Sequence, residues 1–280
     1  MTVKFCLKEC KNRLNSIGVN DPLFEARCLV MKVLNLTSTK LISNCNDEVD
    51  SSKLDELYSM INRRANNEPL QYILGSWSFY GIEFFVGEGV LIPRDDTEIV
   101  VNLCTDFLRN RKEKKVIDLC AGSGAISLAI EKISDADVTA VELSNKAFEY
   151  LTKNIQYNKS SVNPINDDIF TCHTDFEDGS FDLIVSNPPY IKSGDLKTLQ
   201  AEVQKEPSMA LDGGKDGFDF YKAIVSLWSK KLKKGGALAF ELGEKQAEYV
   251  TELMKAVGFG NIHTEIDFGG VQRAIIGTLL

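Results

Sequence analysis

Four consecutive residues, Asn187-Pro188-Pro189-Tyr190, carry the clearest chemical signal in the chain. They follow the apolar run Phe181–Ser186, which predicts a buried strand. Ligands of open α/β sheets bind at the carboxyl ends of the strands, where this tetrapeptide is expected. The prolines stiffen the backbone, so the Asn187 side-chain oxygen and the Pro188 carbonyl can accept both hydrogens of a planar NH2 group. The Tyr190 ring adds a stacking face. The pattern predicts a clamp for an amide or amino group, and a proline-rich turn closing the strand is the alternative.

A second group of residues predicts a nucleoside site. The loop Asp118–Ala125 follows another predicted strand and opens a helix, and its glycines allow a ligand to approach the backbone closely. Cys120 stands where the dinucleotide pattern G-x-G-x-x-G places its first glycine, so a smaller nucleoside is favoured over a pyrophosphate. The loop residues assigned to this site are Asp118, Ala121, Gly122, Ser123, Gly124 and Ala125.

Further candidate ligand contacts stand at the ends of the next two predicted strands. Glu142 can accept both hydroxyls of a ribose. Asp168 can accept from an adenine amino group, and the backbone and side chain of Ile169 can border the ring. Asp118 can balance a positive charge on the ligand, and Asn187 is assigned to the cofactor site as well as to the clamp. Each assignment alone is weak, but together they fit an adenosine with a short cationic tail, which is S-adenosyl-L-methionine.

An alternation of strands and helices from about residue 113 must position these residues. Such alternation indicates an α/β domain whose sheet is mostly parallel and covered by helices on both faces. The last two strands, separated by Gly269-Gly270, predict an antiparallel hairpin. The expected strands are Lys115–Leu119, Asp137–Val141, Pro164–Asp167, Phe181–Ser186, Ala237–Leu242, Ile262–Asp267 and Arg273–Thr278. The expected helices are Ile126–Ile133, Lys146–Asn158, Asp219–Lys230 and Lys245–Val257.

The first part of the chain has a different pattern. Residues 1–66 predict a bundle of three short helices, over Phe5–Ile17, over Pro22–Leu34 with Asn20 or Asp21 as the cap, and from Asp50 or Ser51 onwards. Residues 67–92 predict a β-hairpin linker, with Tyr72–Gly75 as one strand and Phe79–Val86 as the other. Residues 93–280 then form the α/β domain.

Composition narrows the class of protein. The 280 residues carry a net charge of −8, which argues against a large non-specific nucleic-acid footprint. The seven cysteines form no CxxC pair and are expected to be reduced thiols, as is typical of a cytoplasmic protein. No apolar run is long enough to cross a membrane, and no metal site is expected.

These motifs together resemble the class I S-adenosylmethionine-dependent methyltransferases, and within them the protein-(glutamine-N5) methyltransferases that modify peptide chain release factors. The resemblance runs nearly end to end, and its most family-specific segment is Leu91–Glu98. The segments that carry it are Glu68–Gly75, Leu91–Glu98, Asp118–Ala125, Asn187–Ile191, Glu206-Pro207, Ala210–Gly214, Leu232–Gly236 and Asp267–Arg273.

The resemblance implies a Rossmann-like, seven-stranded fold with a small amino-terminal helical domain that binds the protein substrate. It implies S-adenosyl-L-methionine as the cofactor and release factors as partners. The substrate would be the glutamine of their Gly-Gly-Gln loop, and the product N5-methylglutamine, modulating translation termination. The clamp Asn187–Tyr190 would hold that glutamine amide. The protein is not expected to bind a membrane or to form a stable complex with a nucleic acid.

The chain departs from the family pattern at four positions. Proline is usual where Asp95 stands, threonine is common where Ala121 stands, tryptophan is frequent where Ile169 stands, and glutamate is usual where Gln272 stands. Ile169 removes an aromatic contact to adenine, and Ala121 removes a hydroxyl. None of the four departures alters the clamp.

Two other functions remain open at this point. An N-methyltransferase acting on the exocyclic amino group of adenine or guanine in RNA or DNA needs the same clamp, because that NH2 group is also planar. A non-catalytic cofactor-binding protein on the same fold is the second, since a fold does not determine a function. For the helical region, the alternative to substrate binding is a stabilising cap.

Overall fold

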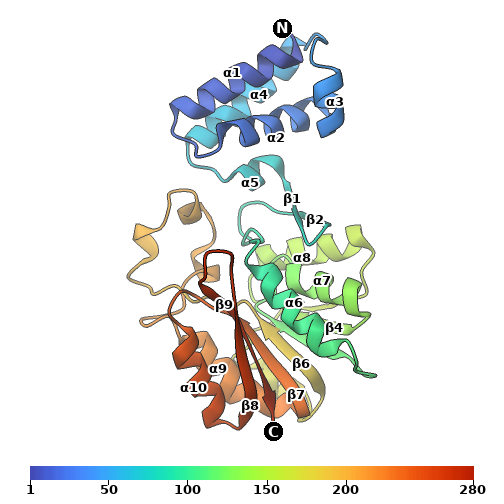
Figure 1. Ribbon diagram of the computed structural model, residues 1–280, viewed down its shortest axis with the longest axis vertical. Helices are drawn as coiled ribbons and strands as arrows, with labels where there is room; N and C mark the ends of the chain where they lie inside the picture. Colours follow the sequence, from blue (N-terminus) through green and yellow to red (C-terminus); the bar gives the residue numbers. More distant parts are fainter. The chain divides into compact units, whose positions relative to one another are not determined.

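The structure, a computed structural model, describes residues 1–280 and divides into two compact units (Figure 1). The first unit is Met1–Ser76 together with Gln200–Lys205. The second unit is Trp77–Leu199 with Glu206–Leu280. A short segment that lies late in the sequence therefore packs with the amino-terminal helices. The sequence had suggested a division at residue 66, within the first unit.

The first unit is helical. Its elements are α1 (Val3–Ser16), α2 (Pro22–Leu34), α3 (Ser38–Ser43), α4 (Ser51–Ala65) and α5 (Leu70–Leu74). Helices α1, α2 and α4 pack against one another and bury an apolar stripe from each helix, including Leu14, Leu29 and Leu57. The Asp21 side chain accepts from the Phe24 N–H at 3.0 Å, which confirms Asp21 as the cap of α2. The short helices α3 and α5 were not predicted.

The predicted hairpin strand at Tyr72–Gly75 is wrong. This segment is helix α5, which ends at Gly75 with a left-handed φ of 76°. A short apolar run does not distinguish a helix from a strand, and here Leu70, Tyr72 and Ile73 are buried in contact with α2 and α4. The hairpin itself consists of β1 (Ser76–Phe79) and β2 (Ile82–Phe85). Tyr80 and Gly81, which were assigned to a strand, form its turn with φ of 51° and 68°.

A seven-stranded sheet forms the centre of the second unit, as the sequence predicts. Its order is β5-β4-β3-β6-β7-β9-β8, with β9 antiparallel to both of its neighbours. The parallel register pairs Leu119 with both Val141 and Ser186, so the residues following three strands meet at one edge. The strands are β3 (Lys115–Leu119), β4 (Asp137–Val141), β5 (Asn163–Ile165), β6 (Phe181–Ser186), β7 (Leu232–Glu241), β8 (Phe259–Ile266) and β9 (Gln272–Leu279).

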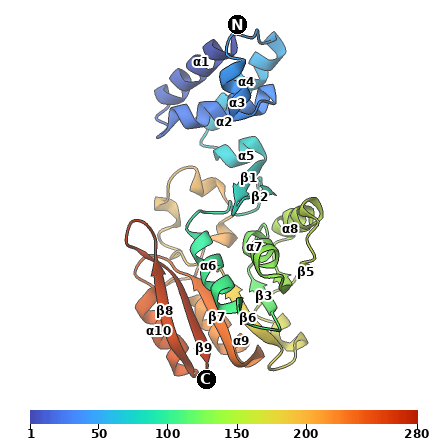
Figure 2. The ribbon, with the colours of Figure 1, turned by 45° about the vertical axis from the view of Figure 1, so that its right-hand side comes forward.

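Helices cover both faces of this sheet (Figure 1 and Figure 2). Helices α6 (Thr97–Leu108), α7 (Ala125–Ser134) and α8 (Asn145–Asn158) lie on one face. Helices α9 (Asp219–Trp228) and α10 (Ala247–Ala256) lie on the other. None of these helices, nor any helix of the first unit, has the length and apolar character needed to span a membrane.

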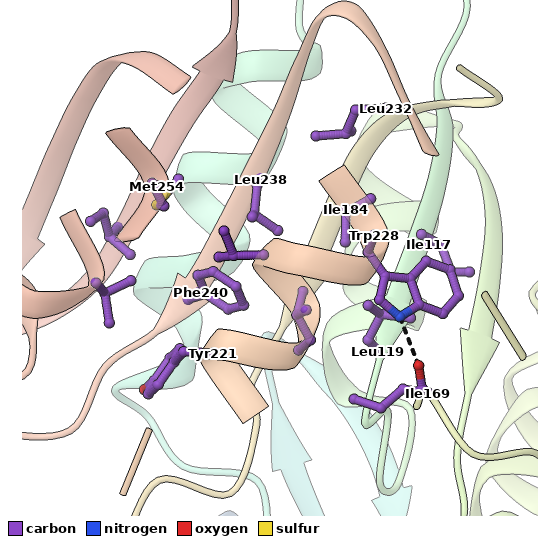
Figure 3. Packing of buried hydrophobic residues seen from close by; sticks show 14 of the residues in the cluster. Ile117, Leu119, Ile169, Ile184, Tyr221, Trp228, Leu232, Leu238, Phe240 and Met254 are labelled. Carbon is purple, nitrogen blue, oxygen red and sulfur yellow. Dashed lines mark hydrogen bonds between the residues drawn. The ribbon is translucent and has the colours of Figure 1, made fainter. Parts of the chain in front are cut away.

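The core under α9 and α10 is a cluster of buried side chains that supports the sheet edge. Trp228 and Tyr221 of α9 are fully buried against strand residues such as Ile117 and Phe240 (Figure 3). The Trp228 indole N–H donates to the Ile169 carbonyl at 2.9 Å, drawn as a dashed line in Figure 3. This bond fixes the loop after β5 to the core.

Candidate active site

The loop after β3 turns sharply under an open space. Cys120, Gly122 and Gly124 have left-handed φ values of 63°, 57° and 84°. A Cβ on Gly124 would lie 2.6 Å from a Leu151 methyl carbon, whereas a Cβ on Gly122 would meet no atom within 4 Å. Gly124 is therefore required for helix packing, and Gly122 leaves room for a ligand to approach the backbone. The buried residues Ala121, Ser123 and Ala125 complete the loop.

Glu142 lies beside this loop as predicted from its place after β4. It is 8% exposed, and its two oxygens accept from the Gly122 and Ser144 N–H groups at 2.8 and 2.7 Å. Burial raises the pKa of Glu142. Because each carboxylate oxygen has two lone pairs, one acceptor position on each oxygen is left for the hydroxyls of a ribose.

Asp118 is a fully buried carboxyl group with an unpaired oxygen. Ser127 donates to Oδ2 at 2.5 Å, and Oδ1 has no hydrogen-bond partner. Burial raises the pKa of Asp118 to about 7. Buried polar atoms are nearly always paired, so the orphaned oxygen indicates a position for a donor from outside the protein. The ammonium group of S-adenosyl-L-methionine is such a donor, and the residues present fit that cofactor.

Asp168 and Ile169 follow β5, and they differ in how much side-chain surface they offer to a ligand. The Asp168 Oδ1 atom accepts from the Phe170 N–H at 2.9 Å, and Oδ2 makes no hydrogen bond within the protein. The Ile169 side chain is 4% exposed and lies in the core cluster (Figure 3). Its side chain therefore offers little surface to an adenine, contrary to expectation, because the bond from Trp228 turns this segment towards the core.

The clamp residues lie at the end of β6, beside the glycine loop. Asn187 is half-buried, and its Nδ2 atom donates to Thr97 Oγ1 at 3.4 Å. No protein group donates to Asn187 Oδ1 or to the Pro188 carbonyl, so both predicted acceptors are available. Pro188 and Pro189 are buried, which holds the backbone of the clamp rigidly.

Two neighbouring segments hold the carboxyl side of the clamp. The Tyr190 carbonyl accepts from the buried Gln246 side chain at 3.0 Å. The strand-like bridge between Ile191 and Asp212 brings Gly213 so close that a Cβ there would lie 2.7 Å from the Tyr190 Cα. The Tyr190 ring is half-buried and packs beside the core cluster.

The segment Leu91–Glu98, which carried the family resemblance, is bonded to several other elements. Arg94 forms an ion pair with the buried Glu206, which also accepts from the Ile92 N–H at 3.0 Å. Asp96 lies 3.2 Å from Arg273. Thr97 donates to Glu241 at 2.5 Å. This segment thus links α6 to β7, β9 and the loop before α9.

Thr97 and Glu241 are the functional-site residues that the sequence reasoning missed. Glu241 ends the apolar strand β7 and is 3% exposed, and its oxygens contact Thr97 and the Tyr190 hydroxyl. Burial raises the pKa of Glu241 to about 7. A lone acidic residue at the carboxyl end of a buried strand was the available signal, since unpaired charges are rarely buried.

Solved structures with similar folds define the class of protein. A methyltransferase from Pyrococcus furiosus aligns with a TM-score of 0.51 and 19% identity, over 82% of this chain and 98% of that one. The hMettl16 catalytic domain in complex with MAT2A 3'UTR hairpin 1 aligns with a TM-score of 0.60 and 12% identity, over 91% of each chain. At these identities the similarity shows the fold alone, which is that of a class I S-adenosylmethionine-dependent methyltransferase.

Sequence relatives identify the family. The PrmC N-terminal domain model matches residues 6–75, and the methyltransferase small domain model matches residues 94–215. A protein of Fusobacterium nucleatum is 38% identical over 94% of this chain and 75% of its own length. A protein of Geobacter sulfurreducens is 37% identical over 99% and 97%, respectively. Both relatives are named release factor glutamine methyltransferase, and the chain belongs to this family.

Proposed function

We propose that this protein transfers a methyl group from S-adenosyl-L-methionine to the side-chain amide N5 of the glutamine in the Gly-Gly-Gln motif of peptide chain release factors. The observation that carries the proposal is the pair of unpaired acceptors at the clamp, Asn187 Oδ1 and the Pro188 carbonyl. A primary amide has two hydrogens to donate, so this pair of acceptors matches it in number. The relatives that are named release factor glutamine methyltransferase support this class of substrate.

Residues of the glycine loop and of the next two strand ends would hold the cofactor. Asp118 Oδ1 would accept from the ammonium group, Glu142 from the ribose hydroxyls and Asp168 from the adenine amino group, and Gly122 has no side chain to block their approach. Bound there, S-adenosyl-L-methionine supplies an electrophilic methyl group on a sulfonium, so the leaving group needs no acid. Ala121, Ser123, Gly124 and Ala125 shape the loop beneath it.

The protein's own task is to position the amide nitrogen. That nitrogen is a weak nucleophile, because its lone pair is delocalised into the carbonyl. Holding both N–H bonds on Asn187 and Pro188 aims the lone pair at the methyl carbon at a separation of about 3–3.5 Å. Both hydrogen bonds strengthen as the nitrogen becomes positive, which stabilises the transition state more than the bound substrate. Tyr190 fixes the plane of the amide from one side.

The surplus proton needs no dedicated base in this proposal. His173 and His263 are the two histidines of the chain, and neither is bonded to a clamp residue. Once methylated, the nitrogen is strongly acidic and loses its proton to solvent.

The helical unit is proposed to bind the release factor, and the reaction is proposed to modulate translation termination. Large apolar side chains that are exposed on this unit support a protein partner: Phe5, Ile17, Leu23, Phe24 and Ile42. The seven free cysteines support a reducing, cytoplasmic location. The net charge of −8 supports a protein substrate over a nucleic acid.

Mass spectrometry of a release factor after incubation with the enzyme and cofactor tests the function. The expected product carries one additional methyl group, on the Gly-Gly-Gln glutamine. Structured RNA and duplex DNA are offered in parallel reactions under the same conditions. Methylation of a nucleic acid with the release factor unmodified would favour the exocyclic-amine alternative. Cofactor binding with no methyl transfer to any of them would favour a non-catalytic protein.

A further inference from the structure

The donor half of the Asn187 amide is held by a chain of hydrogen bonds that ends on a buried carboxylate. Asn187 Nδ2 lies 3.4 Å from Thr97 Oγ1, and Thr97 Oγ1 lies 2.5 Å from Glu241 Oε2. The other oxygen of Glu241 accepts from the Tyr190 hydroxyl at 3.2 Å. Three elements meet here, since Thr97 begins α6, Glu241 ends β7 and Asn187 follows β6.

The direction of each bond in this chain follows from the donors that are available. A threonine hydroxyl has one hydrogen, and Glu241, which is ionised above its pKa of about 7, can then only accept. Thr97 therefore gives its hydrogen to Glu241 and can only accept from Asn187. Asn187 must turn its NH2 group towards Thr97, which leaves its oxygen for the substrate. The opposite orientation would place an NH2 group against the NH2 group of the substrate.

We propose that Glu241 is a positioning residue, which through Thr97 holds the Asn187 amide in its accepting orientation and through Tyr190 holds the ring that fixes the substrate plane. Glu241 is 3% exposed, and its side-chain oxygens accept hydrogen bonds from Thr97 and Tyr190. The inference rests on the proposed reaction at the same clamp.

Burial of Glu241 argues for this role over a role in stability. Removing a carboxylate from water is costly, and an apolar side chain of similar volume is often neutral or stabilising at such a site. Two charge-assisted hydrogen bonds from neutral hydroxyls offset part of that cost. A group retained at a cost to stability at the edge of an active site is expected to serve the chemistry.

A matched pair at Thr97 tests the orientation directly. Thr97→Val keeps the shape and removes the hydroxyl, whereas Thr97→Ser keeps the hydroxyl. We expect kcat for release factor methylation to fall at least about tenfold in Thr97→Val and to stay within about threefold of wild type in Thr97→Ser, because about 1.4 kcal/mol of orientation energy corresponds to tenfold. The Kd for S-adenosylhomocysteine should change by less than about twofold in both.

Two further variants test the same role: Glu241→Met, and Thr97→Val combined with Asn187→Ala. Glu241→Met removes both acceptors at similar volume and should lower kcat by about tenfold or more, with thermal stability close to that of wild type. In an Asn187→Ala background, Thr97→Val should cost less than about twofold further, because coupled residues are not additive. Asp182→Asn, a buried carboxylate at the start of β6, is the control and should retain wild-type kcat.

Separate outcomes identify separate failures. A wild-type enzyme that leaves the release factor unmethylated would refute the proposed function itself. An active wild type whose Thr97→Val and Glu241→Met variants keep kcat within about twofold would refute the positioning role alone. Equal losses of kcat from Thr97→Val in the wild-type and Asn187→Ala backgrounds would also refute it, since the effect would then not pass through Asn187.

Discussion

Asn187 shows how a single hydrogen-bond direction decides what a site can hold. The amide has a donor half and an acceptor half, and Thr97 occupies the donor half. Only the acceptor half is left to face the space beside the glycine loop. Pro188 adds a second acceptor that cannot rotate, because it belongs to the backbone of a diproline corner. In the proposed function, these two acceptors together select a group with two hydrogens on one nitrogen.

Replacing Asn187 by alanine should remove one of these acceptors and leave the other. We expect kcat to fall by about 100-fold or more, the range found when one preorganised hydrogen bond to developing charge is lost. The Kd for S-adenosylhomocysteine should stay within about threefold of wild type. Single-turnover methylation and calorimetry measure the two quantities, and near wild-type turnover would contradict the clamp.

Replacing Glu142 by alanine should act on the cofactor instead. The substitution removes both proposed ribose contacts and the acceptors of the Gly122 and Ser144 N–H groups. We expect at least about tenfold weaker binding of S-adenosyl-L-methionine, because hydrogen bonds to a charged group contribute about 1.5–3 kcal/mol. Unchanged affinity in a calorimetric titration would remove Glu142 from the cofactor site.

The elements around the clamp act as a frame whose spacing is set by backbone contact. The bridge of Ile191 with Asp212 and the bond from Gln246 to the Tyr190 carbonyl hold the corner on two sides. The bonds of Leu91–Glu98 hold α6 to the same edge of the sheet. The glycine at position 213 is part of this frame, because its missing side chain allows the closest approach.

Gly213→Ala should displace the clamp. Its Cβ would lie 2.7 Å from the Tyr190 Cα and 2.8 Å from the Pro189 carbonyl oxygen, and backbone atoms cannot move aside cheaply. We expect a stability loss of about 1–3 kcal/mol and a clear fall in kcat. Gly194→Ala is the control within the same loop, since a Cβ there meets nothing within 4 Å. Equal behaviour of the two variants in urea unfolding and activity assays would contradict the role of this contact.

The whole chain combines a cofactor-binding unit rich in buried acids with a helical unit that has exposed apolar side chains. Burial raises the pKa values of Asp118 and Glu241 to about 7 and also raises that of Glu142. The charge state of the active-site edge is therefore linked to the stability of the entire second unit. The predicted cofactor residues all belong to the second unit, and partner binding is the proposed role of the helical unit.

Stability should fall as the pH rises from about 4.5 to about 7. The folded protein retains protons on Asp118 and Glu241 in this window, whereas the unfolded chain has released them, so the free energy of unfolding decreases with pH and levels off above about pH 7. Asp118→Asn should reduce this slope. Urea unfolding at pH 5 and pH 8 measures the effect, and an equal slope in wild type and variant would contradict the assignment.

Charged substitutions on the helical unit should weaken substrate binding without altering the chemistry. Leu23 and Phe24 are 36% and 47% exposed. We expect Leu23→Glu combined with Phe24→Glu to raise the KM for a release factor severalfold, with kcat retained at saturation, because a buried apolar contact with the partner is lost. Ile133→Glu, at the end of α7, is the control, with 45% exposure on the other unit. An unchanged KM would favour the stabilising cap.

The local sequence pattern was sufficient to predict those parts of the protein whose defining residues lie close together in the chain. The apolar run before Asn187, the glycine loop after β3 and the alternation of strands with helices predicted the sheet, its edge and the residues placed there. These features depend on residues within one element and its turn, so the types of neighbouring residues are enough to predict them. The same reasoning was wrong at Tyr72–Leu74, where a short apolar run has no period long enough to separate helix from strand.

Contacts between distant parts of the chain could be known only from the folded molecule. Thr97 and Glu241 are separated by 144 positions and meet because α6 packs against β7. Ile169 turns its side chain into the core because Trp228, 59 positions away, holds its carbonyl. The segment Gln200–Lys205 joins the helical unit for a similar reason, with Glu202 bonded to Arg64 at 2.7 Å. Such pairs leave no periodic trace in the sequence, since their partners are chosen by packing and not by spacing along the chain.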